Sequence, residues 1–160
     1  MKQNENILKG VINKETSLDD SYLFEQYKLY VNMANDVSNR RESTNKFYIS
    51  IISAIISVTS YITIYYNTIP IFLLIIIIII SILWEAHINE YRQLNKAKFE
   101  VINHIENYLP AKGYTKEWEL LMKEGYKGLT KKDEKIPKYL GTVCIVLIIA
   151  LIINEANSFL

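Results

Sequence analysis

The sequence predicts an all-α membrane protein with three transmembrane helices, of which the first two form a long antiparallel hairpin that extends into a cytoplasmic helical stalk. Three observations lead to this fold class. Half of the 160 residues are hydrophobic and 22% are charged, yet the segments 47–84 and 139–153 contain no charge at all. All eighteen Lys and Arg residues lie outside these two segments. Neither Gly nor Pro occurs in residues 11–69 or 71–109, so long uninterrupted helices can form there.

The first two spans lie on either side of a short turn. Residues 47–66 and 69–84 are uncharged, and roughly 17–25 residues cross a bilayer as a helix. The isoleucine-rich second span has strand propensity, but a strand exposed to lipid would leave its backbone hydrogen-bonding groups unpaired. Asn67 and Thr68 form the predicted turn, and Pro70 suits the first turn of the following helix. The sequence therefore predicts a helical hairpin in the membrane.

A third span is predicted after Pro137. Its uncharged part, residues 139–153, would extend only about 22 Å as a helix, which is shorter than the hydrocarbon core of a bilayer. We therefore expect this helix to include Ile136 and to continue toward Phe159, with local thinning of the bilayer.

The distribution of basic residues predicts the orientation. Seven Lys and Arg residues lie in residues 1–46 and eleven in residues 85–138, whereas the hairpin turn and the tail after Ile153 have none. Basic segments next to spans stay on the cytoplasmic side. The chain thus divides into a cytoplasmic N-terminal segment (1–46), a transmembrane hairpin (47–84), a cytoplasmic helical region (85–138) and a third span with a short outer tail (139–160).

Both hairpin helices are predicted to continue from the membrane into the cytoplasm. The second should run from Pro70 to Leu109 and stop there, because a residue before a proline disfavours the helical conformation. The first should begin near Ser17–Asp20, a capping sequence. It carries a coiled-coil-like seam with a 4-3 repeat, formed by Leu23, Tyr27, Tyr30, Ala34, Val37, Arg41, Thr44, Tyr48, Ile51, Ile55, Val58 and Ile62.

A polar face lies on the opposite side of the first helix, about 200° from the seam. Small polar residues in a span usually mark close helix packing. The alternative interpretation is a water-lined path, although no charge lies deep in the membrane part of this face. Both interpretations stay open from the sequence. The polar face comprises Asn32, Asp36, Asn39, Ser43 and Lys46 and continues into the membrane as a serine face of Ser50, Ser53, Ser57 and Ser60.

Charged residues near the membrane border are predicted to pair across the hairpin. Facing residues should have numbers that add to about 135, since both helices rise equally per residue from the turn. This places Asp36 near Lys98 and brings Glu90 close to basic residues of the first helix. Such partly desolvated pairs should contribute more to stability than exposed ion pairs, which contribute about 0–1 kcal/mol. The residues expected to pair are Asp36, Arg40, Arg41, Lys46, Glu90, Arg92 and Lys98.

Residues 110–138 are predicted to hold two short helices. Thr115 can cap the first helix, and Gly125 and Gly128 can end it. Thr130 can cap the second helix. The side chains expected to dock this segment against the stalk are Trp118, Leu121 and Tyr126.

The sequence contains no recognisable motif for catalysis, metal binding or nucleotide binding. The two histidines, His87 and His104, stand 17 residues apart, and a metal site needs more converging ligands than each has nearby. Glu85 and Glu90 lie among basic residues, where we expect ion pairing rather than acid–base catalysis. The net charge of +1 implies no attraction to nucleic acid. We expect no enzyme activity and no cofactor, and we expect membrane lipid and further copies of the chain as partners.

Three stretches of the chain carry a resemblance to a known family. They are FEQYKLYVNMANDVSNRRESTNKFY (Phe24–Tyr48), YRQLNKAKFEVINHIENYLP (Tyr91–Pro110) and YTKEWE (Tyr114–Glu119). Together they resemble the RipA-family octameric membrane proteins, a family of small bacterial inner-membrane proteins. The resemblance covers most of residues 20–140. It implies a homo-oligomer of eight in the bacterial cytoplasmic membrane, and it implies no catalytic residues.

Two functions are compatible with these properties. The first is a non-enzymatic, self-assembling scaffold or pore-like assembly that serves membrane or stress physiology. The alternative is a triggered effector that disrupts the membrane in a defence or toxin system.

Overall fold

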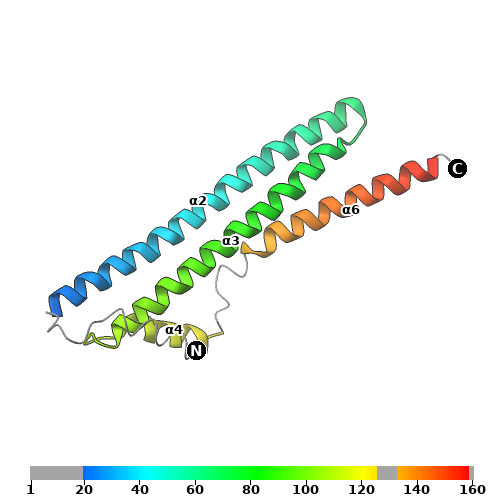
Figure 1. Ribbon diagram of the computed structural model, residues 1–160. Coiled ribbons are helices and arrows are strands. Elements are labelled where there is room, and N and C mark those ends of the chain that lie inside the picture. Colours follow the sequence, from blue (N-terminus) through cyan, green and yellow to red (C-terminus); the bar gives the residue numbers. More distant parts are fainter. Residues whose placement is uncertain (1–19, 126–132, 159–160) are drawn as a thin grey trace. The chain divides into compact units, whose positions relative to one another are not determined.

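Figure 1 shows the computed structural model of the chain, which describes residues 20–125 and 133–158. All regular secondary structure in these ranges is α-helical, as predicted. Three of the helices, α2, α3 and α6, are long and apolar enough to cross a membrane, which confirms the predicted fold class. The helices are α2 (Asp20–Tyr66), α3 (Ile71–Glu106), α4 (Gly113–Lys123) and α6 (Lys135–Ser158).

The helices α2 and α3 form the predicted antiparallel hairpin, and each continues without a break past its uncharged span (Figure 1). Asn67 follows α2 with a φ of 48°, a left-handed conformation that asparagine tolerates better than most residues. The Thr68 hydroxyl donates to the Tyr66 carbonyl at 3.2 Å, which closes the turn locally. The predicted capping residue Ser17 lies outside the described residues.

The C-terminal end of α3 differs from the prediction. The helix ends at Glu106, three residues before the predicted end at Leu109. The N–H groups of residues 107, 108 and 109 donate to the carbonyls three residues earlier, at 3.2, 2.9 and 3.3 Å. These bonds tighten the last turn into the 3₁₀ pattern that commonly ends an α-helix. The chain thus leaves the helix before Pro110 requires it to.

The helices divide into two compact units. Among the described residues, the first unit contains 20–40 and 91–125, and the second contains 41–90 and 133–158. The first unit holds the charged ends of α2 and α3 together with α4. The second holds the uncharged parts of α2 and α3 together with α6.

The core of the second unit is organised around one side of α3. The buried residues of this side alternate at intervals of three and four residues, as in a coiled coil. A Cβ added to Gly141 of α6 would lie 3.8 Å from the Ser81 side chain, so small residues bring α3 and α6 close together. The buried α3 residues are Leu74, Ile77, Ser81, Trp84 and Ile88, and they meet Tyr48 and Ile52 of α2 and Cys144 of α6.

The outward surface of the second unit is strongly apolar. Large hydrophobic side chains such as Ile79 and Ile82 are 52% and 63% exposed. Exposed apolar surface on this scale marks contact with lipid or with another protein. The helix α6 begins at Lys135, four residues before the uncharged segment, and therefore includes Ile136 as predicted. Phe159 lies outside the described residues.

The buried side of α2 follows the predicted 4-3 seam closely up to Tyr48, and beyond it the predicted positions Ile51, Ile55 and Ile62 are half-buried. Every predicted seam position from Leu23 to Tyr48 is buried or half-buried. Beyond Tyr48 the most buried residue is Ile52, which the seam did not include, and the predicted position Val58 is 51% exposed. A straight α-helix drifts by about 20° per heptad from a 3.5-residue repeat, so a step of four residues restores the contact.

The short helix α4 starts and docks differently from the prediction. It begins at Gly113, so Thr115 lies within its first turn instead of capping it. Of the residues predicted to dock this segment, Trp118 is 54% exposed and Leu121 is half-buried. Gly125 has a φ of 75° and ends the helix as predicted, because this conformation favours glycine. The predicted positions Tyr126, Gly128 and Thr130 lie outside the described residues.

Candidate functional site

An aromatic and amide cluster ties α2 to α3 in the second unit. Trp84 is 2% exposed and stacks on Tyr48, with ring centroids 5.7 Å apart and an interplanar angle of 12°. Its indole N–H donates to Asn45 Oδ1 at 2.8 Å. The Tyr48 hydroxyl and His87 Nδ1 share a hydrogen bond of 2.6 Å. A buried indole needs an acceptor, so this pairing fixes one register of the hairpin.

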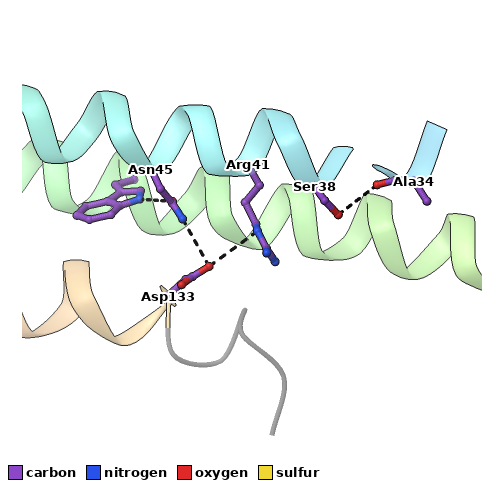
Figure 2. A network of polar contacts seen from close by, with 6 residues as sticks. Ala34, Ser38, Arg41, Asn45 and Asp133 are labelled. Atoms are coloured by element: carbon purple, nitrogen blue, oxygen red, sulfur yellow. Dashed lines mark hydrogen bonds and ion pairs between the residues drawn. The ribbon is translucent and has the colours of Figure 1, made fainter. Parts of the chain in front are cut away.

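Asp133 connects the same cluster to the segment that precedes α6 (Figure 2). The Asn45 side chain accepts from the indole with its oxygen and donates to Asp133 Oδ2 with its nitrogen, at 3.5 Å. Arg41 Nε lies 3.8 Å from the same Asp133 oxygen. Figure 2 shows Asn45 and Arg41 reaching the carboxylate from the same side of α2. A second contact, Lys138 to Glu85 at 3.1 Å, joins α6 to α3.

The ion pairs differ from those predicted across the hairpin. Arg41 approaches Asp133 instead of Glu90, and Lys46 pairs with Glu42 on its own helix at 2.7 Å. Aromatic and amide side chains make the polar contacts between α2 and α3 at this level, through Tyr48 with His87 and Asn45 with Trp84. Within the described ranges, no ion pair joins another residue to Asp36, Arg40, Glu90 or Lys98.

The serine face is exposed along its whole length. Ser50, Ser57 and Ser60 each donate to the carbonyl four residues earlier, at 2.8 Å. These bonds satisfy the hydroxyls within α2 and leave a surface of small side chains. Such a surface suits close packing of a neighbouring helix as well as contact with water, so the role of the serine face stays a prediction.

Glu106, the last residue of α3, joins the three helices of the first unit. It is fully buried and lies 22 residues beyond Trp84, outside the uncharged span. Its Oε1 accepts from the Tyr27 hydroxyl at 2.8 Å and from the Tyr114 N–H at 2.8 Å. Its Oε2 accepts from the Thr115 N–H at 3.0 Å and from the Thr115 hydroxyl at 2.7 Å. The carboxylate of Glu106 thus replaces the cap that the sequence predicted for Thr115.

The environment of Glu106 favours its ionised form. Burial alone would raise the pKa of this carboxyl, but the hydrogen bonds from Thr115, Tyr114 and Tyr27 outweigh it and hold the pKa below its usual value. The negative charge also lies at the positive end of the α4 dipole. Burial raises the pKa of the Tyr27 hydroxyl, and the bond to Glu106 raises it further. A carboxylate held ionised by four donors orders α4 and is poorly suited to proton transfer.

Sequence reasoning missed the Glu106 cluster. Tyr27 was one of the predicted seam positions, and Glu106 directly follows a buried residue of α3, Ile105. The signal available was an acidic residue at the end of a helix and just before a second helix. Spacing alone does not identify which of the seventeen acidic residues turns inward.

A groove of about 830 Å³ lies beside this cluster, between the start of α2 and residues 107–113. Its walls include the aromatic rings of Phe24, Tyr27 and Tyr108. The described residues that line it carry no carboxylate, imidazole, amine or thiol group. The groove therefore offers surface for binding, and the hydroxyl of Tyr27 in its wall is bonded to Glu106.

The two histidines lie in different surroundings. His87 bonds to Tyr48, and the His104 ring packs edge-on against Tyr108 at 5.6 Å. Among the residues that the structure describes, no three His, Cys, Asp or Glu side chains gather closely enough to hold a metal ion.

Comparison with known proteins gives one family. Residues 24–153 match the octameric membrane protein family (8xMP). Neither the curated proteins nor the solved structures contain a match to the chain.

Proposed function

Because the chain belongs to the octameric membrane protein family, we propose that it is a non-enzymatic protein that assembles as an octamer in the bacterial cytoplasmic membrane. The assembly serves as a scaffold or pore-like structure in membrane or stress physiology. The observation that carries this proposal is the large apolar surface that single chains leave uncovered. In the most apolar stretches of α2 and α6 only 11% of the residues are buried within the chain, compared with 28% for α3.

The unequal burial of the three spans supports contacts between copies through α2 and α6. Lipid covers apolar surface without preference, so lipid alone gives no reason for small polar residues to gather on one side of a span. The serine face supplies such a side on α2. We therefore assign Ser50, Ser53, Ser57 and Ser60 to close packing against a neighbouring copy, with a water-lined path as the competing role.

Replacing Ser53 and Ser57 together with leucine tests the serine face. Two leucines block close approach of a helix, so the octamer should dissociate in detergent when measured by native mass spectrometry. The matched control replaces Ile75 and Ile79, exposed residues of α3, with leucine and should leave the octamer intact. An intact octamer that no longer conducts ions in liposomes would instead assign the serine face to a water path. If both the octamer and the flux are unchanged, neither role is correct.

The distribution of charge supports an orientation with the N-terminus and residues 85–138 in the cytoplasm and the C-terminus outside. A cysteine introduced at Leu160 should react with a membrane-impermeant maleimide on whole cells, in a chain whose own Cys144 is replaced by alanine. Reaction only after lysis would reverse the orientation. Growth arrest upon induction, together with leakage of the membrane, is the outcome expected of the alternative function, a triggered membrane-disrupting effector.

A further inference from the structure

The first unit presents two outward polar faces, one on each hairpin helix. On α2, residues such as Ala34 and Val37 are buried against α3, whereas Asn32, Asp36 and Asn39 are exposed on the opposite side. On α3, Ile102 and Ile105 are buried, whereas Gln93 and Lys96 are exposed. We call Asn32, Asp36 and Asn39 the outer face of α2, and Gln93 and Lys96 the outer face of α3.

The contact between Tyr27 and Glu106 indicates which residues of the two outer faces lie at the same height along the hairpin, that is, at the same level. Their side chains are bonded at 2.8 Å, so they stand at the same height along the hairpin. Asp36 lies nine residues after Tyr27, and Lys96 lies ten residues before Glu106. Both distances are about 14–15 Å along a helix, so Asp36 and Lys96 are level. Within one chain both side chains are exposed, and neither forms an ion pair with a described residue.

A ring of identical copies brings such level residues together. The one-sided charge distribution makes every copy insert in the same direction, so the symmetry axis runs along the membrane normal. Rotation about this axis preserves height, and each contact in the ring joins two different surfaces. When the hairpin stands parallel to this axis, residues that are level within one chain are also level between neighbours.

From this geometry we infer that the outer face of α2 in one copy packs against the outer face of α3 in the next copy. Asp36 meets Lys96 and Asn39 meets Gln93 across this contact. The charges are complementary at the level where the faces meet, and the two amides can exchange hydrogen bonds. The neighbouring helices run antiparallel, as they do within each hairpin. This inference rests on the proposed octamer and names the contact that forms outside the membrane.

Disulfide formation between separately encoded copies tests the contact. Copies with Asn39→Cys and copies with Gln93→Cys are co-expressed, both with Cys144→Ala, so that an Asn39–Gln93 crosslink can form only between chains. Mild oxidation should give a covalent dimer on a non-reducing gel. The matched control pairs Asn32→Cys with Gln93→Cys, because residue 32 lies on the same face but about 10 Å away along α2. This control pair should give no dimer.

Charge reversal tests the pairing itself. Asp36→Lys and Lys96→Asp should each reduce the octamer seen by native mass spectrometry, and the double variant should restore it. If the unmodified chain is octameric but the cysteine variants form no disulfide and the double charge reversal does not restore the octamer, the inferred contact is wrong and the proposed function stands. If the unmodified chain is not octameric, the proposed function fails and the inference fails with it.

Discussion

Replacing Glu106 with alanine should release α4 from the rest of the first unit without unfolding the hairpin. The substitution removes the acceptor for four hydrogen bonds, from the Tyr27 hydroxyl, the Tyr114 N–H and the N–H and hydroxyl of Thr115. It also removes a negative charge from the N-terminal end of α4. The ring contacts of Tyr114 with Phe99 and Tyr27, at 5.7 and 6.5 Å between centroids, would remain.

The expected magnitude follows from the number and type of these bonds. A hydrogen bond to a charged group contributes about 1.5–3 kcal/mol, and the contributions of bonds that share one acceptor do not add fully. Counting two of the four at the lower value gives about 3 kcal/mol for the docking of α4. Since about 1.36 kcal/mol corresponds to a tenfold change, the open state should become about 150-fold more populated.

Hydrogen–deuterium exchange of the full chain in detergent measures this change. Peptides that cover residues 113–123 should exchange about 150-fold faster in the alanine variant, because exchange reports local opening. Glu117→Gln, which alters an exposed carboxyl of the same helix, is the matched control and should leave exchange unchanged. Tyr27→Phe removes one donor and should have an intermediate effect. Unchanged protection of α4 in the alanine variant would refute the view that Glu106 holds this helix.

Three further predictions concern the continuity of α3, the register of the hairpin and the effect of pH. Leu94→Pro should break α3 at a cost of about 3 kcal/mol or more. The chain should still insert, but the assembly should fail and the protein should elute as a smaller species on a detergent column. An unchanged elution volume would argue against a role of the continuous helix in assembly. Trp84→Phe removes the donor to Asn45 and should lower the free energy of unfolding by about 1 kcal/mol in thermal denaturation, whereas no change would show that the amide contact does not set the register. The pKa of the Glu106 carboxyl is lower in the folded chain than in the unfolded chain, where it is about 4.3. The contribution of Glu106 to the docking of α4 is therefore complete above the unfolded pKa and is lost as the pH falls through the folded pKa. In the Trp84→Phe chain, Trp118 is the only remaining tryptophan, and its fluorescence should therefore be constant from pH 7 to about 5 and change only in more acidic buffer.

The hairpin and its spans were predictable because they depend on local or one-dimensional properties of the chain. The absence of charge from residues 47–84 and the lack of Gly and Pro on either side of Pro70 are sufficient to predict two long helices. A bilayer accepts only backbone that satisfies its own hydrogen bonds, which removes the strand alternative for an isoleucine-rich segment. The same reasoning correctly extended α6 to include Ile136, since a span must cover the hydrocarbon thickness.

The predictions were less accurate where two elements meet. Beyond Tyr48 the 4-3 repeat of α2 missed the most buried residue, Ile52, and included the exposed Val58, because the small angular drift of a straight helix accumulates. The pairing of charges across the hairpin also differed, because approximate levels do not tell which side chains point into the seam. Arg41 meets Asp133, a residue from a distant part of the chain that no counting from the turn includes.

The sequence by itself thus determined that this chain has three membrane-spanning helices, where the hairpin turns and which side of α2 is polar. These properties follow from burial in lipid and from the 3.6-residue period, which act on every residue independently of its distant neighbours. Only the tertiary structure decided that Glu106 caps α4 and that Asn45 links Trp84 to Asp133. Such bonds require donor and acceptor within about 3 Å, and that distance depends on the register and the ends of helices that are remote in the sequence.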